Sequence, residues 1–400
     1  MRLAIRILFI LLLYVAGTAN GQPQKQDSVA SAPMAEELFY DSLKVRASRH
    51  GLTRFIYDHL ILERDEPDGM DVQLRLLQKN NGKTIASIHL IPLEVFGPTF
   101  QDTARNPKYG IGRFGNRMHT TTDPRIIRKN LLFRPGDTLD ADRVLENERI
   151  IRSLPFIKDA RFLVSPLETD TCLVDLTVLT KDVFSFGLSM HLGGTNSGKL
   201  GLYNQNIWGV GHQVSVDFVG HTEKKPHNGY EAEYTVNNIA GNFVDLSLGY
   251  NNTYRRKGVL LDFEKDFLLN TTRWGGGMSF HRLKHSDHLL NYDEVYSDYP
   301  LNYKVFDIWS GYGIRLNQSA DPLQLVVSGR YRFLKFLDRP EVEPGIRPYY
   351  SGSRLYLGSI SLSKRTYIRD YLVYSYGISE DIPRGFLHEW VFGFDDNEFT

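Results

Sequence analysis

The second half of the chain, residues 183–400, alternates apolar and polar side chains over a series of short segments. Phe184, Phe186, Leu188 and Met190 occupy every second position of the first segment. A period of two predicts a strand with one apolar face and one polar face. Because the polar face recurs in one segment after another, the pattern is typical of a meander with lipid on one side and water on the other.

Polar turns divide this region into roughly twelve predicted strands. They span residues 184–192, 201–209, 214–218, 230–236, 244–250, 259–269, 274–283, 306–316, 323–333, 355–362, 372–378 and 386–394. The turn at 238–241 is short, whereas the connections at 284–302 and 338–353 are long. Short turns on one side and long loops on the other predict a mainly β fold, a transmembrane antiparallel β-barrel.

The N-terminal residues 1–21 have the three parts of a secretory signal peptide. Arg2 and Arg6 precede an apolar run at residues 7–16, and small residues follow at Ala19 and Gly21. The run is shorter than the roughly 20 residues of a transmembrane helix. No later segment has such a run, so an exported membrane protein of this sequence is expected to cross the bilayer with strands.

Residues 22–82 form a predicted lead-in. Residues 22–34 are rich in Gln, Ser, Ala and Pro and predict disorder. Residues 36–61 combine apolar positions with basic residues, as amphipathic helices do. Such helices either pack on the next domain or serve as a plug or a membrane-surface helix.

Net charge and cysteine content limit the partners and sites that are expected. The 400 residues carry a formal net charge of +0, which gives no reason to expect a nucleic-acid partner. The single cysteine, Cys172, excludes an intramolecular disulfide and a cysteine metal cluster. Its apolar neighbours predict a buried thiol in a strand.

Residues 83–182 read as one α/β module. A strand is predicted at 84–93, followed by a loop rich in Gly and Arg up to Gly115. Asp123 and Pro124 predict the start of a helix, and a second helix ends before Pro155. Two strands follow, at 157–164 and 172–179.

The order of these elements, with a Pro-Gly-Asp turn between the helices, resembles a polypeptide-transport-associated (POTRA) domain. The motif Asn-Ile-Trp-Gly-Val-Gly at residues 206–211 is similar to an early-barrel signature. Together, over residues 83–400, they resemble the outer-membrane assembly and translocation superfamily (BamA/TamA-like, bacterial surface antigen type). Barrels of that superfamily have sixteen strands, and residues 396–400 read as a loop. We therefore expect an incomplete barrel over residues 183–400.

The resemblance implies a role for Arg384, Gly385 and Phe386, which match the Arg-Gly-aromatic motif of a long loop folded into the barrel lumen. There the Arg would pair with inward-facing carboxylates. Pro383 departs from the aliphatic residue usual at that position. A tight turn with an exposed Arg is the alternative.

Two further groups of residues are candidates by the same resemblance. Asn206, Gly209 and Gly211 belong to the first strands, which form a weak seam in the superfamily, although a bulge at a barrel corner is the alternative.

Gly136, Leu154 and Phe156 belong to the helix–strand motif of the POTRA-like module. The strand at 157–164 is predicted to lie at an edge, where it either adds a client strand or is covered and purely structural.

Signals for enzymatic chemistry are absent from the sequence. His212, His221 and His227 are predicted to lie on strands and a turn, where polar-face positions fit better than a metal site. The glycines at 275–277 lack the helix and Lys of a phosphate loop. No cofactor and no metal is expected.

Three functions are compatible with these patterns. The first is an outer-membrane barrel with one periplasmic POTRA domain, which assists insertion of outer-membrane proteins or polypeptide translocation. Its partners would be unfolded polypeptides, outer-membrane lipid and periplasmic accessory proteins. The second is a passive pore or surface receptor. The third, a soluble β-sandwich, is disfavoured by apolar positions repeated over a dozen strands.

Overall fold

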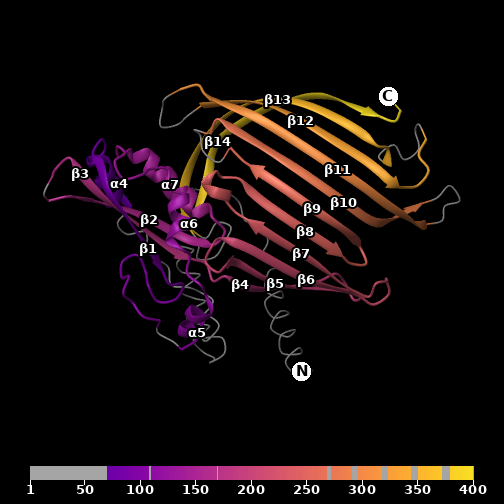
Figure 1. Ribbon diagram of the computed structural model, residues 1–400, viewed down its shortest axis with the longest axis horizontal. Helices are drawn as coiled ribbons and strands as arrows, with labels where there is room; N and C mark the ends of the chain where they lie inside the picture. Colours follow the sequence, from indigo (N-terminus) through magenta and orange to yellow (C-terminus); the bar gives the residue numbers. More distant parts are fainter. Residues whose placement is uncertain are drawn as a thin grey trace, which may run out of the picture. The chain divides into compact units, whose positions relative to one another are not determined.

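Two β-sheets organise the described part of the chain (Figure 1). The computed structural model describes residues 70–107, 110–168, 170–267, 272–290, 296–317, 323–343, 350–371 and 379–399. All of them belong to one compact unit, Arg64–Thr400. The signal peptide, the lead-in up to residue 69 and the predicted strand at 372–378 lie outside the described residues.

The first sheet and its helices form what we call the small module, residues 70–182. Its elements are α4 (Met70–Lys79), β1 (Thr84–Leu93), α5 (Gly110–Met118), α6 (Pro124–Lys129), α7 (Ala141–Ser153), β2 (Ile157–Pro166) and β3 (Leu173–Asp182). The strand order is β1-β3-β2, with β1 parallel and β2 antiparallel to the central β3. Within the part of the chain that the structure describes, no helix has the length and apolar character needed to cross a membrane.

Helix α6 of the small module begins at the capping residue from which the sequence predicts its start. Asp123 accepts a hydrogen bond from the Arg125 N–H at 2.8 Å, and Pro124 occupies the first position of α6. The core is built from α4, α7 and all three strands, with fully buried side chains such as Leu77, Ile151 and Phe162. Burying each of these side chains contributes about 1.5–3 kcal/mol.

Two sequence predictions for the small module are wrong. The stretch up to Gly115 was expected to be a loop because glycine disfavours helices, yet it contains α5. A Cβ on Gly115 would lie 2.6 Å from the Phe96 ring, so glycine lets this helix approach Phe96 closely. Cys172 is exposed rather than buried, because it lies in the turn just before β3.

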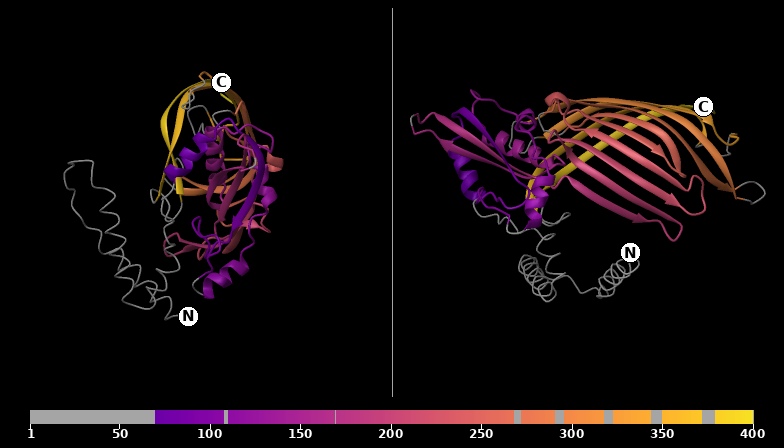
Figure 2. Two further views of the ribbon diagram at one scale, coloured as in Figure 1. Left: turned by 90° about the vertical axis from the view of Figure 1, so that its left-hand side faces the viewer. Right: turned by 60° about the horizontal axis from the view of Figure 1, so that its bottom comes forward.

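The second sheet has eleven antiparallel strands in sequential order. They are β4 (Phe186–Leu192), β5 (Ser197–Ile207), β6 (His212–His221), β7 (Asn228–Val236), β8 (Asp245–Asn252), β9 (Arg256–Lys265), β10 (Trp274–Leu290), β11 (Tyr296–Arg315), β12 (Leu323–Asp338), β13 (Ser353–Tyr371) and β14 (Ser379–Asn397). The sheet is strongly curved across its strands (Figure 2).

The register places apolar residues in continuous rows on one face. One row runs through directly paired residues of β4 to β9: Leu188, Leu202, Val216, Ala232, Tyr250 and Val259. Another crosses the later strands through Tyr312, Val327, Ile360 and Trp390. Many of these large side chains are solvent-exposed, so the sheet presents a broad apolar face.

The strands differ from the predicted ones between residues 284 and 302. Much of the expected long loop at 284–302 is strand, because β10 and β11 pair continuously from Trp274↔Tyr312 to Leu290↔Tyr296. The described sheet contains a counterpart of eleven of the predicted strands, and the remaining one, at 372–378, lies outside the described residues. The strand order ends at β4 and β14. These two end strands each have a single strand neighbour in that order.

Candidate functional site

A tight turn between β5 and β6 joins the large sheet to the small module. Residues 206–211 form this docking turn, in which Gly209 and Gly211 have φ of +73° and +75°. Asn206 is buried at its base. The Asn206 side chain accepts a hydrogen bond from the Gly211 N–H and donates one to Thr122 Oγ1, both at 2.8 Å. One side chain therefore shapes the turn and fixes it to the small module.

Both glycines of the docking turn lie directly against the small module. A Cβ on Gly209 would clash with the carbonyl oxygen of Thr121, and one on Gly211 would lie 2.8 Å from the Phe156 ring. The Asp123 N–H also donates to the Gly209 carbonyl at 2.8 Å. Side chains at these two positions are excluded both by positive φ and by lack of space.

A buried polar cluster lies behind the docking turn. The His119 ring contacts Asp182 Oδ2 through Nε2 at 3.0 Å and Ser185 Oγ through Nδ1 at 2.8 Å. The Thr122 N–H and hydroxyl donate to the same Asp182 oxygen at 2.7 and 2.9 Å. These residue types could form a hydrolytic triad, but Ser185 is only 1% exposed. The cluster therefore fixes the connection between β3 and β4 and offers no access to a substrate carbonyl.

The turn between β7 and β8 makes a second contact with the small module. The Asn238 amide donates to Asn130 Oδ1, at the end of α6, over 2.7 Å, and this hydrogen bond is buried. A Cβ on Gly241 would lie 3.1 Å from the Lys129 carbonyl oxygen. The β5–β6 and β7–β8 turns therefore both lie against α6.

The last strands make a third contact with the small module, through α7. Arg152 donates to both carboxylate oxygens of Asp381 in β14, at 3.0 and 2.7 Å, and to Glu148 at 2.6 Å. Burial lowers the pKa of Arg152, but the hydrogen bond to Asp381 and the nearby carboxylates outweigh it, so the pKa is raised. The Arg149 guanidinium lies 4.1 Å from the centre of the Tyr367 ring in β13.

The small module thus contacts both ends of the strand order. It binds the turns that follow β5 and β7, and it also binds β13 and β14 (Figure 1). Arg152 and Asp381 are 229 residues apart. Nothing in the sequence pairs these two residues, so the contact is visible only in the folded chain.

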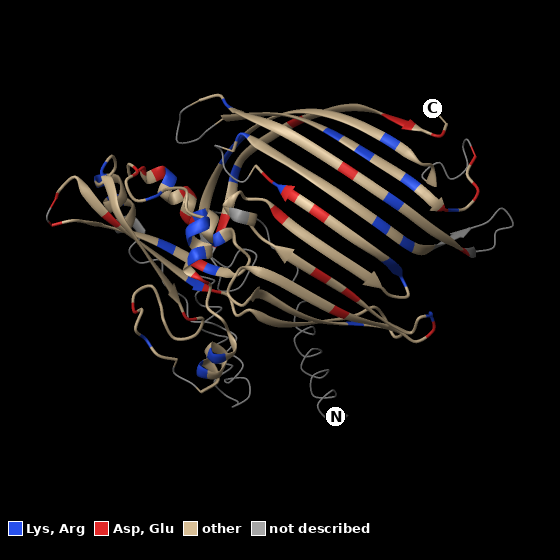
Figure 3. Ribbon diagram, in the orientation of Figure 1, with Lys and Arg blue, Asp and Glu red and all other residues tan. Residues whose placement is uncertain are grey.

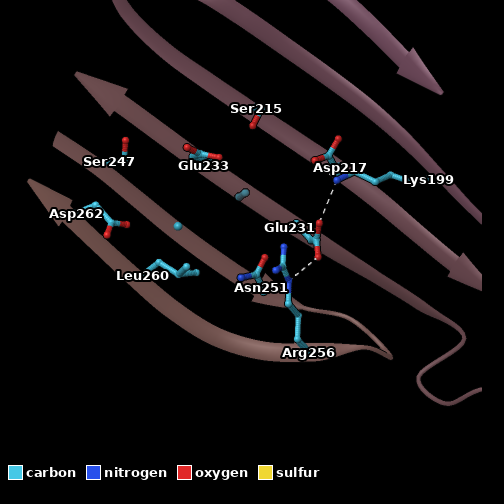
Figure 4. A pocket seen from close by; sticks show the side chains of 12 residues that line it. Lys199, Ser215, Asp217, Glu231, Glu233, Ser247, Asn251, Arg256, Leu260 and Asp262 are labelled. Atoms are coloured by element: carbon cyan, nitrogen blue, oxygen red, sulfur yellow. Dashed lines mark hydrogen bonds and ion pairs between the residues drawn. The ribbon is translucent and has the colours of Figure 1, made fainter. Parts of the chain in front are cut away.

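The polar face of the sheet contains a cavity of about 200 Å³ over β5 to β9 (Figure 4). Lys199 Nζ lies 2.8 Å from Asp217 Oδ2 and 3.1 Å from Glu231 Oε2. Arg256 Nε lies 3.1 Å from the other oxygen of Glu231. The four side chains therefore form a chain of ion pairs across the strands. Polar groups that also line the cavity are Ser215, Glu233, Ser247, Asn251 and Asp262.

Charge is unevenly distributed over the sheet (Figure 3). Strands β6 to β8 carry four acidic residues and no Lys or Arg: Asp217, Glu231, Glu233 and Asp245. On β12 and β13 basic residues predominate: Arg330, Arg332, Lys335, Arg354, Lys364, Arg365 and Arg369. Asp217, Glu231 and Arg330 lie on the face opposite the apolar rows, whereas Lys335, Arg354 and Lys364 are in register with the apolar rows. Apart from charged residues such as these three, the sheet has the apolar and polar faces expected of a sheet between lipid and water.

The module motif residues have structural roles. Gly136 has φ of +94°, and its N–H donates to the Ile85 carbonyl at 2.8 Å, which holds the Pro-Gly-Asp turn against β1. Leu154 caps α7 through a backbone hydrogen bond to Ile151. Phe156 is 1% exposed and contacts Gly211, so the structure brings this motif together with the docking turn.

The predicted lumen loop at Arg384, Gly385 and Phe386 is wrong, because all three lie inside β14. They pair in register with β13, for example Gly385 with Arg365. A Cβ on Gly385 would clash with a β13 carbonyl, so glycine permits the pairing. Pro383 is tolerated nearby because an end strand has one edge without ladder hydrogen bonds.

The edge of β2 is partly occupied. The Phe162 N–H donates to Glu148 at 3.0 Å, and the Gln73 side chain donates to the Phe162 carbonyl. Arg152 reaches the Ala160 carbonyl at 3.5 Å. At these two residues the backbone groups already have partners from α4 and α7. This favours the interpretation of β2 as a covered structural edge.

The three histidines considered as metal ligands do not converge. His212 and His221 lie at opposite ends of β6, and His212 is hydrogen-bonded to Tyr234 at 2.5 Å. His227 lies near His221 in the following turn. Over the described ranges, no group of three or more His, Cys, Asp or Glu side chains has the spacing to hold a metal ion.

Comparison with known proteins gave matches only at the level of structure. No family model matches the chain, and neither does any curated protein sequence. Similar solved structures include BamA from Haemophilus ducreyi lacking POTRA domains 1-3, with 9% identity, a TM-score of 0.35, and coverage of 78% of this chain and 85% of that chain. CdiB from Acinetobacter baumannii gives 12% identity, a TM-score of 0.27, and coverage of 92% and 100%.

At these TM-scores the superpositions do not define a correspondence of individual strands or residues. The function therefore has to follow from the contacts within this chain.

Proposed function

We propose that the chain is an outer-membrane protein that assists the insertion or translocation of polypeptides by pairing a client strand with an end strand of its sheet. The observation that carries this proposal is β14. Its 19 residues are paired with β13 along their whole length, and it ends the strand order. Its other backbone edge is therefore a row of hydrogen-bonding groups without a strand neighbour in that order.

The side chains of β14 support the placement of this edge in lipid. Trp390, Phe392 and Phe394 are 59–64% exposed, so this strand continues the apolar face. In hydrocarbon, each unsatisfied backbone group costs several kcal/mol. The other end strand, β4, has only 7 residues against the 19 of β14. Among the described strands, β4 is long enough to pair with only part of β14, and we propose that a client strand pairs with the rest of that edge.

The remaining parts of the chain have supporting roles in this proposal. Residues 1–21 direct export, residues 22–82 form the lead-in, and residues 83–182 form a periplasmic POTRA-like domain. Residues 183–400 form the membrane sheet. Because the small module binds turns near β4 and also binds β14, its position sets the separation of the two end strands. No catalysed reaction and no nucleotide is involved.

Cross-linking tests this mechanism directly. Phe394 in β14 and Ile308 in β11 lie in the same row of the apolar face, through Tyr331 and Tyr356. In a chain whose single cysteine is removed by Cys172→Ser, F394C and I308C are placed in vesicles and mixed with an unfolded barrel client carrying one cysteine. Directly opposed strand residues lie about 5 Å apart. A disulfide is expected with F394C and not with I308C.

Client folding provides the functional measurement. The rate at which the client folds into vesicles should rise when the purified chain is present. Equal rates with and without the chain, or equal cross-linking at both positions, would sink the proposal.

A passive pore or surface receptor is the second candidate. The observation in its favour is the polar face, where the ion pairs of Lys199, Glu231 and Arg256 surround a cavity. Conductance that persists after deletion of residues 83–181, together with unchanged client folding rates, would favour this function.

A further inference from the structure

One face of helix α5 packs against Phe96 and Pro107 of the small module. Gly112 and Gly115 are buried, and a Cβ on either would lie 2.6–3.0 Å from atoms of Phe96 or Pro107. The Asn116 side chain accepts a hydrogen bond from the Phe96 N–H at 3.0 Å and donates one to the Phe96 carbonyl at 2.9 Å. The orientation of this helix is therefore fixed.

A second face of α5 exposes a stripe of large apolar side chains. Ile111, Phe114 and Met118 are 47%, 62% and 49% exposed. Their spacing of three and four residues places them on one side of a helix. Arg113 and Arg117, one turn apart, are exposed on the next face around the helix. An ordered helix that exposes three large apolar residues beside two arginines has the composition of a binding surface.

The apolar stripe is connected to the apolar face of the sheet. The Phe96 ring, which supports α5, lies 5.8 Å from Phe184, and Phe184 lies 6.2 Å from Phe186. Phe186 is the first residue of β4 and is 45% exposed on the apolar face. The row of three aromatic rings therefore leads from α5 to the end of that face where β4 begins.

We propose that α5 is a membrane-surface anchor, which inserts Ile111, Phe114 and Met118 into the anionic lipid layer that surrounds the sheet. The proposal rests on the outer-membrane placement proposed above. Interfacial helices bury an apolar face about 5–10 Å deep at the boundary of headgroups and acyl chains, with Arg or Lys on the polar face. Arg113 and Arg117 supply the charge that binds lipid phosphates, and the glycine face keeps the helix packed on Phe96 and Pro107.

Site-specific fluorescence tests the anchor in the full chain. In the Cys172→Ser background, an environment-sensitive fluorophore is attached to F114C, to L76C on α4 and to V327C on the apolar face. Leu76 and Val327 are 40% and 47% exposed, which makes all three positions accessible to the label. The protein is reconstituted in vesicles of phosphatidylcholine and phosphatidylglycerol that contain a nitroxide lipid.

The expected result is strong quenching at positions 114 and 327 and weak quenching at 76. Quenching at 327 without quenching at 114 overturns the anchor while leaving the membrane placement intact. The same result is expected if residues 36–61 or another protein, instead of lipid, binds the apolar stripe of α5. Absence of quenching at 327 would contradict the proposed function and the anchor with it.

The arginines provide a second readout. In R113Q/R117Q, quenching at 114 should fall when phosphatidylglycerol is present and approach the value in pure phosphatidylcholine, because the attraction to anionic lipid is lost. Quenching at 114 that does not depend on phosphatidylglycerol or on the arginines would overturn the choice of an anionic lipid surface.

Discussion

Single residues decide how the large sheet meets the small module. Gly209 and Gly211 combine positive φ with direct contact to Thr121 and Phe156. The Asn206 side chain accepts a hydrogen bond from the Gly211 N–H, which closes the turn, and donates one to Thr122 Oγ1. By its resemblance to the superfamily, the motif at residues 206–211 predicts a weak seam between strands. A role of these residues in opening the sheet stays a prediction. Their contacts connect the second sheet to the small module.

The docking turn can be tested with a matched pair of glycines. Gly209 and Gly194 both have positive φ, +73° and +87°, but a Cβ on Gly194 meets no atom within 4 Å. Gly194→Ala should cost only backbone strain, about 1 kcal/mol. Gly209→Ala adds a clash with Thr121 and should cost about 3 kcal/mol or more. Urea midpoints of the vesicle-bound chain measure both, and equal shifts would refute the role of close contact.

The ion pair between α7 and β14 permits a second residue-scale test. Arg152 and Asp381 are 6% and 15% exposed, so Asp381→Asn leaves a buried guanidinium with one carboxylate partner fewer. The free energy of unfolding should fall by about 3 kcal/mol, the lower end of the range for a broken buried pair, because Glu148 remains as a partner of Arg152. Tryptic cleavage within α7 should accelerate in parallel.

Arg125→Gln is the control for this test, because its pair with Asp123 is at the surface, with Arg125 85% exposed. The urea midpoint of this variant should not change, since exposed ion pairs contribute little to the free energy of unfolding. An effect of Asp381→Asn no larger than that of Arg125→Gln would show that the α7 contact does not hold β14.

At the scale of elements, contacts with other segments override the local preference of a segment for loop structure. Helix α5 contains three glycines, which predict a loop, yet Phe96 and Asn116 stabilise the helix. Residues 384–386 look like a loop motif, yet 19 residue pairs with β13 keep them in β14. In both cases the partner lies outside the short segment that carries the pattern, as with Phe96 for α5 and Arg365 for Gly385, so the pattern alone could not indicate it.

The covered edge of β2 gives an element-scale prediction. Glu148 accepts the Phe162 N–H at 3.0 Å, so Glu148→Ala removes the partner of a buried backbone donor. Loss of such a partner costs about 1–3 kcal/mol. Hydrogen exchange at the Phe162 amide should accelerate about tenfold or more, which is the factor that 1.4 kcal/mol produces. Asp142→Ala, in the exposed first turn of the same helix, should leave that amide unchanged.

At the scale of the whole molecule, the two faces of the sheet should respond differently to charge. Val326 and Val327 are adjacent on β12 and point to opposite faces, with Val327 in the apolar row of Tyr312 and Ile360. Val327→Lys should reduce folding into vesicles by about 2–4 kcal/mol near the bilayer midplane, whereas Val326→Lys faces polar groups and should cost about 1 kcal/mol or less.

Heat-modifiable migration on gels, which separates folded from unfolded barrel proteins, measures the folded fraction of both variants. Equal losses for the two lysines would mean that the apolar face is not in contact with lipid. The inserted fraction of the unchanged chain gives the reference.

The sequence by itself determined the alternation of strands, the two-faced sheet, and the order of helices and strands in most of the small module. Periodicity and capping are local, so each is readable from neighbouring residues such as Asp123 and Pro124. Only the tertiary structure decided which residues meet: Arg152 with Asp381, His119 with Ser185, Phe156 with Gly211. The contact of Arg152 with Asp381 depends on the curvature and register of all eleven strands, and the other two depend on how the first strands pack on the small module. The sequence near any one of these residues does not encode that arrangement.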